Sequence, residues 1–402
     1  MMSKIIGLAE AFLLCLSKAL RQLKKMDTCG KIAVITTAML FLPFFLGGLG
    51  VVVASVYVLT RRELRTKIFS VRWSIFLFLF SALTLVVSVC YLNWRGIVGA
   101  VGIFLLFVYA LFMRVVMTER LYHYLMKVIC SLSIVSALYT MTQLWHILPL
   151  NPLYRGYSTF FNPNYYATIA EFIIFVCFYQ LFFVKKGRAF YLTALLFNVV
   201  GLASTGCRSA WMGVVAGLIV MLFLLKRYRL VLGIIGFALA VLAAGYLWPD
   251  LIPRFDSVGA SAIDRFRIWE SGLWALEDCL WFGKGLYTYY YSCLHQTVDF
   301  MVNKPHSHNL YLDFLLNFGI IGCSLLMVYL TGTVGGILKK VRQGCKNKVW
   351  ILMAGVFVSI LAHGIMDVTI LGVETSIMML VLFSGVGIYD RYHPQEALAH
   401  PR

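Results

Sequence analysis

The side chains best suited to phosphate chemistry lie where long apolar segments end. Arg208 stands in STGCRSAW, residues 204–211, between two apolar runs. Arginine presents a rigid fork of five donors that matches phosphate oxygens and stays protonated. We therefore interpret Arg208 as a phosphate clamp. The simpler alternative is an arginine that anchors the chain at a membrane interface.

Two more arginines occur in DRFRIW, residues 264–269. Residues two apart on a helix point in different directions, so we expect one arginine to face a substrate and the other to face solvent or Asp264. We favour Arg267 for the substrate side, because it lies one turn before Ser271. The alternative is that Arg265 and Arg267 belong to a solvated charged patch.

The densest polar cluster is His306-Ser307-His308-Asn309, followed by Tyr311. A neutral imidazole, whose pKa is about 6.5, can take a proton from a hydroxyl group at neutral pH. Asn309 could orient a sugar or an imidazole, or it could cap a helix. Two histidines supply only two metal ligands, and a zinc site needs three or four, so we expect no metal.

Four further positions carry weaker signals. Gly283 and Gly285 flank a lysine, and glycines let a backbone approach a ligand closely. Asn164 follows a proline at the start of an apolar run, where it could simply begin a helix. Asp367 follows another apolar run and could pair with an arginine or support a histidine.

The composition indicates which elements position these side chains. Of the 402 residues, 61% are hydrophobic and 13% are charged, which excludes a soluble globular domain and an intrinsically disordered chain. Apolar runs recur along the whole length, so the sequence predicts a polytopic membrane protein rather than an enzyme with one anchor. Basic cytoplasmic loops explain the net charge of +18, and we predict no binding of nucleic acid.

We predict about twelve membrane-spanning helices. The first two are short and form either a tight hairpin around Gly47-Gly48 or one long helix, so the count is eleven or twelve. The only acidic residue well inside a predicted span is Glu171. The predicted spans cover residues 32–46, 49–60, 73–92, 96–113, 128–147, 165–184, 189–205, 209–225, 230–248, 310–337, 349–366 and 374–389.

The distribution of basic residues predicts the orientation. With a cytoplasmic N-terminus, inner segments hold 27 of the 35 lysines and arginines, and outer segments hold the other eight. The predicted organisation is a cytoplasmic amphipathic basic segment at 1–31, with a surface helix over 4–23, helices at 32–248, an extracytoplasmic loop at 249–307, helices at 308–389 and a cytoplasmic tail at 390–402.

The long outer loop is expected to be functional. We predict an amphipathic helix over 262–281 that lies on the outer membrane surface. The loop also offers Cys279 and Cys293 for a disulfide. The apolar face of this helix would comprise Ile263, Phe266, Trp269, Leu273 and Leu276.

Arg208, Arg267, His308 and Asp367 are distant in sequence, yet the predicted topology puts them at one membrane face. Cationic forks beside a basic imidazole suit a lipid-linked phosphate or pyrophosphate, because a departing pyrophosphate needs electrostatic stabilisation. The sequence has no ATP-binding motif, so the donor must already be energised. A sugar joined to a lipid pyrophosphate is such a donor.

The motifs TGCRSAW, RFRIW, GKG and HSHNLYLD, in this order over roughly residues 150–370, resemble the O-antigen ligase family. That superfamily also contains O-antigen polymerases and bacterial protein O-oligosaccharyltransferases. The resemblance implies an all-helical fold of the glycosyltransferase C type with about twelve transmembrane helices and one large extracytoplasmic loop. It also implies transfer of a glycan from undecaprenyl pyrophosphate to an acceptor hydroxyl, with inversion and without a metal or other cofactor.

The resemblance assigns the roles residue by residue. Arg208 and Arg267 would hold the pyrophosphate, and His308 would be the general base. The expected partners are the lipid-linked donor, a glycan or glycolipid acceptor and the bilayer, with the site on the extracytoplasmic face of the bacterial inner membrane. The other expected substrate-binding residues are Arg265, His306, Asn309, Gly283, Gly285, Tyr311, Asp367 and Asn164.

Two alternatives stand beside a ligase. A polymerase would join lipid-linked repeat units and leave a ladder of long chains on the lipid carrier. A transporter or flippase for the same glycan would need polar residues near the bilayer midplane and broken helices in both halves. The sequence offers only Glu171 at such a depth and shows no inverted repeat.

Overall fold

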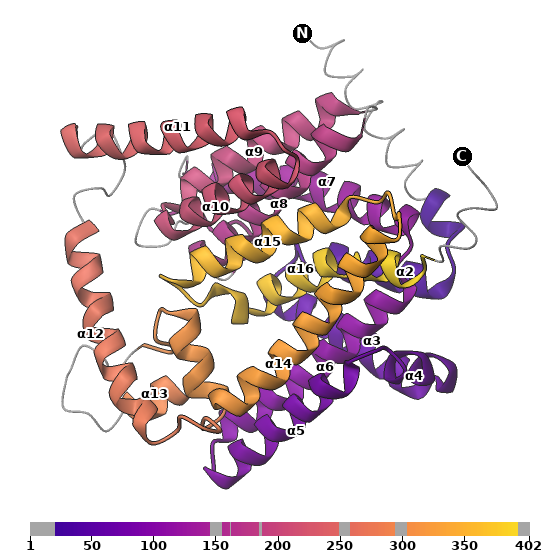
Figure 1. The fold of residues 1–402 in the computed structure, drawn as a ribbon, viewed down its shortest axis with the longest axis vertical. Coiled ribbons are helices and arrows are strands. Elements are labelled where there is room, and N and C mark those ends of the chain that lie inside the picture. The colour runs from indigo at the N-terminus through magenta and orange to yellow at the C-terminus, as the bar shows by residue number, and fades with distance from the viewer. Residues whose placement is uncertain are drawn as a thin grey trace.

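The computed structural model describes residues 21–144, 155–160, 162–184, 187–248, 258–293 and 304–392. All regular elements in this part of the chain are helices, arranged as a bundle (Figure 1). In chain order they are α2 Thr28–Met39, α3 Phe44–Thr60, α4 Arg62–Phe69, α5 Ser74–Cys90, α6 Trp94–Val116, α7 Glu119–Leu144, α8 Pro163–Phe183, α9 Arg188–Thr205, α10 Arg208–Leu224, α11 Tyr228–Leu247, α12 Val258–Glu277, α13 Thr288–Cys293, α14 Leu310–Arg342, α15 Val349–Gly364, the 3-10 turn η2 Thr369–Leu371, α16 Val373–Phe383 and α17 Val386–Asp390.

A helix covers most of every predicted span, and the all-helical membrane architecture is confirmed. Among the described residues, seven helices are long and apolar enough to cross a membrane, and the bent pair of α3 and α4 would make eight. Four shorter apolar helices, α2, α5, α10 and α15, fall below that length. The exact number of twelve spans therefore stays a prediction.

The predicted turn at Gly47-Gly48 is wrong, because both glycines lie within α3. The chain turns instead between α2 and α3, where Pro43 stands directly before the first residue of α3. Proline has no backbone N–H and disfavours helical conformation in the residue before it, so the two helices separate there. Pro43 was the stronger signal in this segment.

Burial differs sharply between the helices. The most apolar 18-residue stretch of α8 is 78% buried, whereas that of α11 is only 6% buried. A helix that is apolar on all sides belongs in the interior of a bundle, as α8 does. Figure 1 shows α11 at the edge of the bundle, where its apolar side chains are exposed. In a membrane protein such a face contacts lipid.

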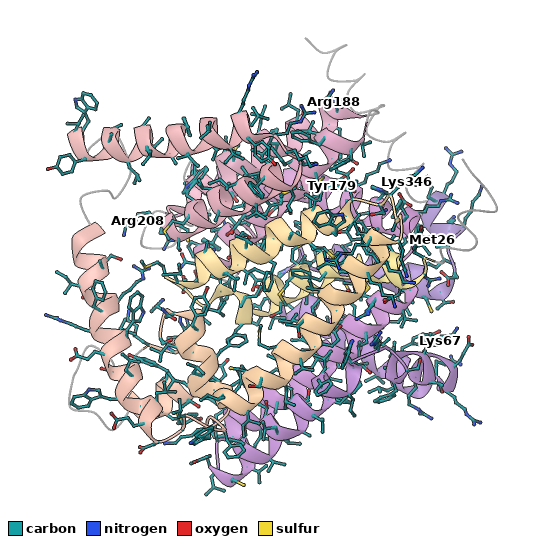
Figure 2. The ribbon with its side chains drawn as sticks, viewed as in Figure 1. Met26, Lys67, Tyr179, Arg188, Arg208 and Lys346 are labelled. Carbon is teal, nitrogen blue, oxygen red and sulfur yellow. The ribbon has the colours of Figure 1, made fainter. Side chains whose placement is uncertain are left out.

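The bundle has two distinct ends. Helix α15 begins beside α17, where the backbone N–H of Trp350 donates to Tyr389 Oη at 2.8 Å. Its 16 residues span about 24 Å and carry the chain to the other end. In Figure 2, Lys67, Arg188 and Lys346, all assigned to inner segments, lie to the right, and Arg208 lies on the left side. Arg208 therefore lies apart from these three cations, and the membrane side of each end stays a prediction.

The helix predicted over 262–281 corresponds to α12, and it packs on α14 through a stripe beside the predicted apolar face. Ile268, Ala275 and Cys279 are buried against Leu312 and Leu316 of α14. Gly272 lies on the same face, where a Cβ atom would collide with Leu312. Trp269 and Leu276 of the predicted apolar face pack beside this cluster, and the rest of that face is exposed, so its contact with the membrane surface stays a prediction. Its exposed members are Ile263, Phe266 and Leu273.

Several predictions about the loops are also resolved or left open. The disulfide considered between Cys279 and Cys293 is not formed, because Cys279 is a free thiol that donates to the Ala275 carbonyl at 3.2 Å. The surface helix expected over 4–23 lies almost entirely outside the described residues. The domain boundaries at 249–307 and 390–402 also fall partly outside them and stay predictions.

Candidate active site

The centre of the candidate site is a histidine–carboxylate pair contributed by two distant segments. His308 Nδ1 lies 3.1 Å from Asp367 Oδ1, and the side chains are 22% and 3% exposed. His308 precedes α14 and has a φ of 52°, a left-handed conformation that costs a residue other than glycine about 1–2 kcal/mol. Such strain at a cluster of polar side chains is typical of functional sites.

Asp367 is held by three donors. Its Oδ1 also accepts the backbone N–H of Val368 at 2.9 Å, and its Oδ2 accepts Nδ2 of Asn164 at 2.7 Å. Burial raises the pKa of Asp367, but the hydrogen bond from His308 and the charges of nearby histidines lower it more, so the net pKa lies below its ordinary value. Asp367 is therefore an anion that draws the imidazole proton of His308 to Nδ1.

This arrangement leaves Nε2 of His308 as the basic nitrogen. Among the described residues, none forms a hydrogen bond with that atom. The carboxylate fixes the orientation of the ring and would stabilise the imidazolium that forms when Nε2 takes a proton. The pair therefore has the geometry of a general base with its supporting acid anion.

His306 lies beside this pair. Its Nδ1 accepts the backbone N–H of His308 at 3.3 Å, and the two ring centroids are 4.4 Å apart. Burial is the main cause that lowers the pKa of His306 to about 4, and His308 lowers it further. His306 is thus neutral at physiological pH and leaves His308 as the base.

The same three residues could also hold a metal, because ligand atoms of His306, His308 and Asp367 lie within 4.8 Å of one another. The sequence indicated only the two histidines as ligands, and the fold adds the carboxylate. A metal on His308 Nδ1 or on Asp367 would compete with the hydrogen bond between them. The absence of a metal from the reaction stays a prediction.

Asn309 and Tyr311 have structural contacts. Asn309 caps α14, since its Oδ1 accepts the backbone N–H groups of Tyr311 and Leu312 at 3.1 and 3.0 Å. Its Nδ2 donates to the Ile365 carbonyl at 3.2 Å. The Tyr311 hydroxyl donates to the Leu361 carbonyl at 2.9 Å. Both residues fasten the start of α14 to the end of α15, and their contact with substrate stays a prediction.

Arg208 is positioned by the turn between α9 and α10. Gly206 ends α9 with a φ of 60°, and Cys207 caps α10, so Arg208 becomes the first residue of α10. Arg208 is half-buried and lies on the left side in Figure 2. The N-terminus of a helix carries a partial positive charge that adds to the attraction for an anion.

The fold distinguishes the two arginines of α12. Arg265 Nε donates to the carbonyl of Met366 at 3.0 Å, directly before Asp367. Arg265 also donates to Ser261 Oγ at 2.5 Å. Arg267 is exposed on a different side of the helix. The two arginines therefore point in different directions, as expected, and it is Arg265 that contacts the loop of Asp367.

Gly283 and Gly285 lie against α14 where that helix is kinked at Gly319. Their φ values of 70° and 87° belong to the left-handed region that favours glycine. The Gly285 N–H donates to the Asn317 carbonyl at 3.0 Å, and a Cβ on Gly283 would collide with the same carbonyl. Close backbone packing accounts for both glycines, and their role in substrate binding stays a prediction.

The sequence analysis singled out Asn164 and Glu171 separately but missed that they form a polar stripe on α8 with Thr168. Asn164, Thr168 and Glu171 follow the spacing i, i+4, i+7, which places them on one face of the helix. Each contacts the segment around the end of α15: Asn164 binds Asp367, Thr168 donates to Thr369 at 2.7 Å, and Glu171 binds His363. Polar residues at this spacing in an otherwise apolar helix could have indicated that this face of α8 contacts other polar groups.

Ser307 and Asp313 form a second missed contact. The backbone N–H of Ser307 donates to Asp313 Oδ1 at 2.9 Å, and Asn317 Nδ2 donates to Asp313 Oδ2 at 3.0 Å. Asp313 therefore anchors the strained segment before α14 from inside the helix. It occupies the last position of the HSHNLYLD motif.

Two comparisons with known proteins find similarity over part of the chain. A family model described as O-antigen ligase matches residues 193–327, which contain Arg208, Arg267 and His308. The teichuronic acid biosynthesis protein TuaE of Bacillus subtilis (strain 168) is 29% identical over 259 residues, which cover 57% of this chain and 52% of the relative. The chain thus spans about half the length of this curated relative. The resemblance read from the motifs is confirmed, because residues 193–327 are similar to the O-antigen ligase family.

Proposed function

We propose that the protein is a membrane glycosyltransferase that moves a glycan from undecaprenyl pyrophosphate to an acceptor hydroxyl. The observation that carries this proposal is the 3.1 Å contact between His308 and Asp367, which leaves a basic Nε2 within an O-antigen ligase family domain. The family match supports the glycosyltransferase class, and the helical bundle supports a multi-pass membrane protein.

The reaction is a single displacement. His308 Nε2 takes the proton of the acceptor hydroxyl, and the resulting oxygen nucleophile attacks the anomeric carbon of the lipid-linked sugar. The bond from that carbon to the pyrophosphate oxygen breaks as the new glycosidic bond forms, so the configuration inverts. Asp367 stabilises the imidazolium, and undecaprenyl pyrophosphate leaves with the electron pair.

Arg208 and Arg267 are proposed to bind the pyrophosphate. Their guanidinium groups would offset the charge that develops on the leaving oxygen. The position of Arg208 at the start of α10 supports this role, since a helix N-terminus favours an anion. Arg265 supports the loop that carries Asp367, residues 365–368, by donating to the Met366 carbonyl. We call this segment the base loop. The charge distribution favours a site on the extracytoplasmic face of the bacterial inner membrane.

A polymerase that joins lipid-linked repeat units is the second candidate. The name of the Bacillus subtilis relative refers to teichuronic acid biosynthesis, which supports a role in making a polysaccharide. The same base and arginines would serve this reaction, because only the acceptor differs. The acceptor would then be the terminal sugar of another lipid-linked glycan.

The product of the purified, reconstituted protein distinguishes these functions. The full chain is incubated with undecaprenyl-pyrophosphate glycan and with glycolipid or glycan acceptors, and the products are analysed by mass. A ligase adds the donor glycan to the acceptor and releases undecaprenyl pyrophosphate. A ladder on the lipid carrier would assign the polymerase. Donor that crosses the vesicle membrane without any transfer would contradict both and indicate a transporter.

A further inference from the structure

We infer that the buried pair of Glu171 and His363 is a positioning element. The pair fixes the position of the base loop relative to the turn between α9 and α10, which carries Arg208. This inference rests on the proposed function. Glu171 belongs to α8 and His363 to α15, and neither touches the acceptor or donor directly in this scheme. Their role is to fix where Asp367 and Arg208 stand relative to each other.

The His363 ring connects three elements. Its Nδ1 lies 2.8 Å from Glu171 Oε2, and the two side chains are 3% and 0% exposed. Its Nε2 lies 4.0 Å from Sγ of Cys207, the residue directly before Arg208. One imidazole therefore contacts α8 on one side and the turn between α9 and α10 on the other.

A second connection joins the same elements. Asp367 lies four residues after His363, and Asn164 lies two helical turns before Glu171. Arg155 donates to Asn164 Oδ1 and to the carbonyl of Thr205, both at 2.5 Å. The base loop is thus linked through α8 to the same α9–α10 turn that carries Arg208. Two parallel chains of contacts fix one relative position.

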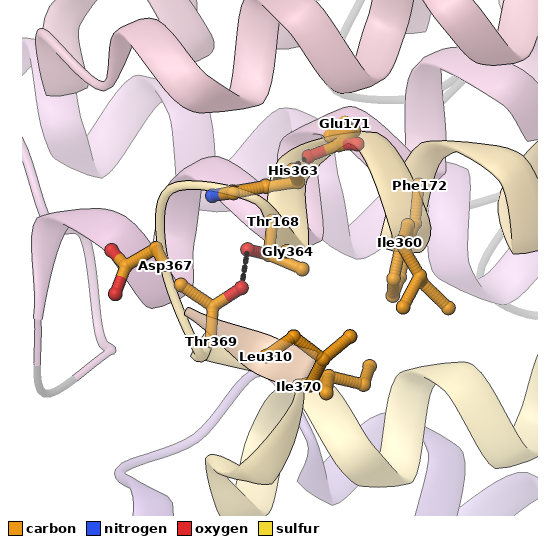
Figure 3. A pocket seen from close by; sticks show the side chains of 10 residues that line it. All are labelled: Thr168, Glu171, Phe172, Leu310, Ile360, His363, Gly364, Asp367, Thr369 and Ile370. Atoms are coloured by element: carbon orange, nitrogen blue, oxygen red, sulfur yellow. Dashed lines mark hydrogen bonds and ion pairs between the residues drawn. The ribbon is translucent and has the colours of Figure 1, made fainter. Parts of the chain in front are cut away.

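The pair and the base loop also share a small cavity. Glu171, His363 and Asp367 all line it, and it has room for about one water molecule. Figure 3 shows the His363 ring between Glu171 and the loop that carries Asp367. A displacement of His363 would therefore reshape the cavity that the carboxylate of Asp367 also lines.

Stability alone does not account for this pair. Removing two charges from water is costly, and apolar residues of similar volume often replace a buried ion pair without loss of stability. Ionisable residues inside a membrane protein are rare and mark functional positions. Moreover, Glu171 Oε1 has no hydrogen-bond partner among the described residues and lies against Gly213, where a Cβ would collide with it.

The test compares Glu171→Gln with a matched control, Asp390→Asn. Both variants remove one carboxylate charge from a pair that joins two helices, but Asp390 pairs with Arg114 at the opposite end of the bundle. We expect Glu171→Gln to lower kcat for transfer at least tenfold and to change the Kd for undecaprenyl pyrophosphate less than twofold. We expect Asp390→Asn to keep the kcat of the wild type, although its melting temperature falls.

A double-mutant cycle separates positioning from general stability. If Glu171 acts through the base loop, Glu171→Gln combined with Asp367→Asn is no slower than Asp367→Asn alone. Fully additive losses, or an unchanged kcat in Glu171→Gln, would overturn the inference. Failure of the wild-type protein to transfer any glycan would instead remove the proposed function, so the two failures are distinguishable.

Gly213→Ala covers the case in which Glu171→Gln does not fold. This variant keeps every polar group but places a methyl against Glu171 Oε1 and 3.1 Å from the Ser359 carbonyl. We expect the same fall in kcat with donor binding retained. A wild-type kcat in folded Gly213→Ala would overturn the inference.

Discussion

Each end of the bundle contains a partly buried charged pair, and the two pairs differ in which polar atoms they leave available. At one end, Arg114 forms two hydrogen bonds with Asp390, at 2.6 and 3.0 Å, and its third nitrogen lies 3.2 Å from the Tyr329 hydroxyl. At the other end, Asp367 binds Nδ1 of His308, and Nε2 of His308 has no hydrogen-bond partner among the described residues. Arg114 has partners at all three guanidinium nitrogens, whereas His308 keeps a basic atom for chemistry.

The difference shows how to separate a structural charge from a functional one in this fold. A side chain whose polar atoms are all paired stabilises the bundle, because each buried group is satisfied. A strained, partly exposed side chain with one unpaired basic nitrogen indicates a reaction centre. Each of the following changes tests whether this distinction is correct.

The largest effect in this series is expected for Asp367→Asn. The amide keeps the shape of the side chain but removes the anion that holds the His308 proton on Nδ1 and stabilises the imidazolium. Transfer should fall about 10²–10⁴-fold, the usual contribution of general acid–base catalysis. The measurement is kcat with saturating donor and acceptor. An activity within threefold of the wild type would remove Asp367 from the site.

A smaller effect is expected for Arg208→Lys. Lysine keeps the positive charge but loses the planar fork that binds two phosphate oxygens at once. Transfer efficiency should fall about tenfold, since a paired charge-assisted contact contributes about 1.5–3 kcal/mol and lysine restores part of it. Titration with undecaprenyl pyrophosphate measures the accompanying loss of donor affinity. Unchanged binding and turnover would count against a phosphate clamp.

Arg265→Lys and Arg267→Lys should change different kinetic constants. Arg265 holds the Met366 carbonyl beside Asp367, so its replacement should lower kcat with little change in donor KM. Arg267 is proposed to contact the pyrophosphate, so its replacement should raise donor KM. Steady-state kinetics at varied donor concentration distinguishes the two. The reverse pattern would exchange their assignments.

The smallest effect concerns pH and stability at His306. The unfolded chain binds a proton on this histidine at a pKa of about 6.5, and the folded chain binds it only at about 4. The unfolded state therefore holds more protons between these values, so stability falls as the pH falls from 6.5 to 4. The melting temperature of His306→Gln should fall less than that of the wild type over this window. Parallel curves would contradict the buried, neutral histidine.

The helices were predictable because apolar length and end signals are local. Asn162 and Pro163 begin α8, and Asn309 caps α14, as their residue types indicate. The pairing of Glu171 with His363 was not predictable, since the two residues are 192 positions apart. Helical periodicity indicates which residues share a face, but not which other helix covers that face.

The same limit applies to α12. The sequence contains two adjacent apolar stripes, and it cannot show which of them packs against protein. Leu312 and Leu316 select the stripe of Ile268 and Ala275, which then fixes the directions of Arg265 and Arg267. The sequence indicated two possible metal ligands instead of three for a similar reason. Asp367 is distant from His306 and His308 in sequence, and the fold brings it beside them.

The most direct test measures His308→Ala and Asp390→Asn side by side in one transfer assay, with undecaprenyl pyrophosphate binding measured on the same preparations. The account predicts that His308→Ala binds the lipid pyrophosphate but transfers no glycan above background, and that Asp390→Asn transfers at the rate of the wild type. Substantial transfer by His308→Ala would contradict the account, because the basic nitrogen that defines the site would then be dispensable.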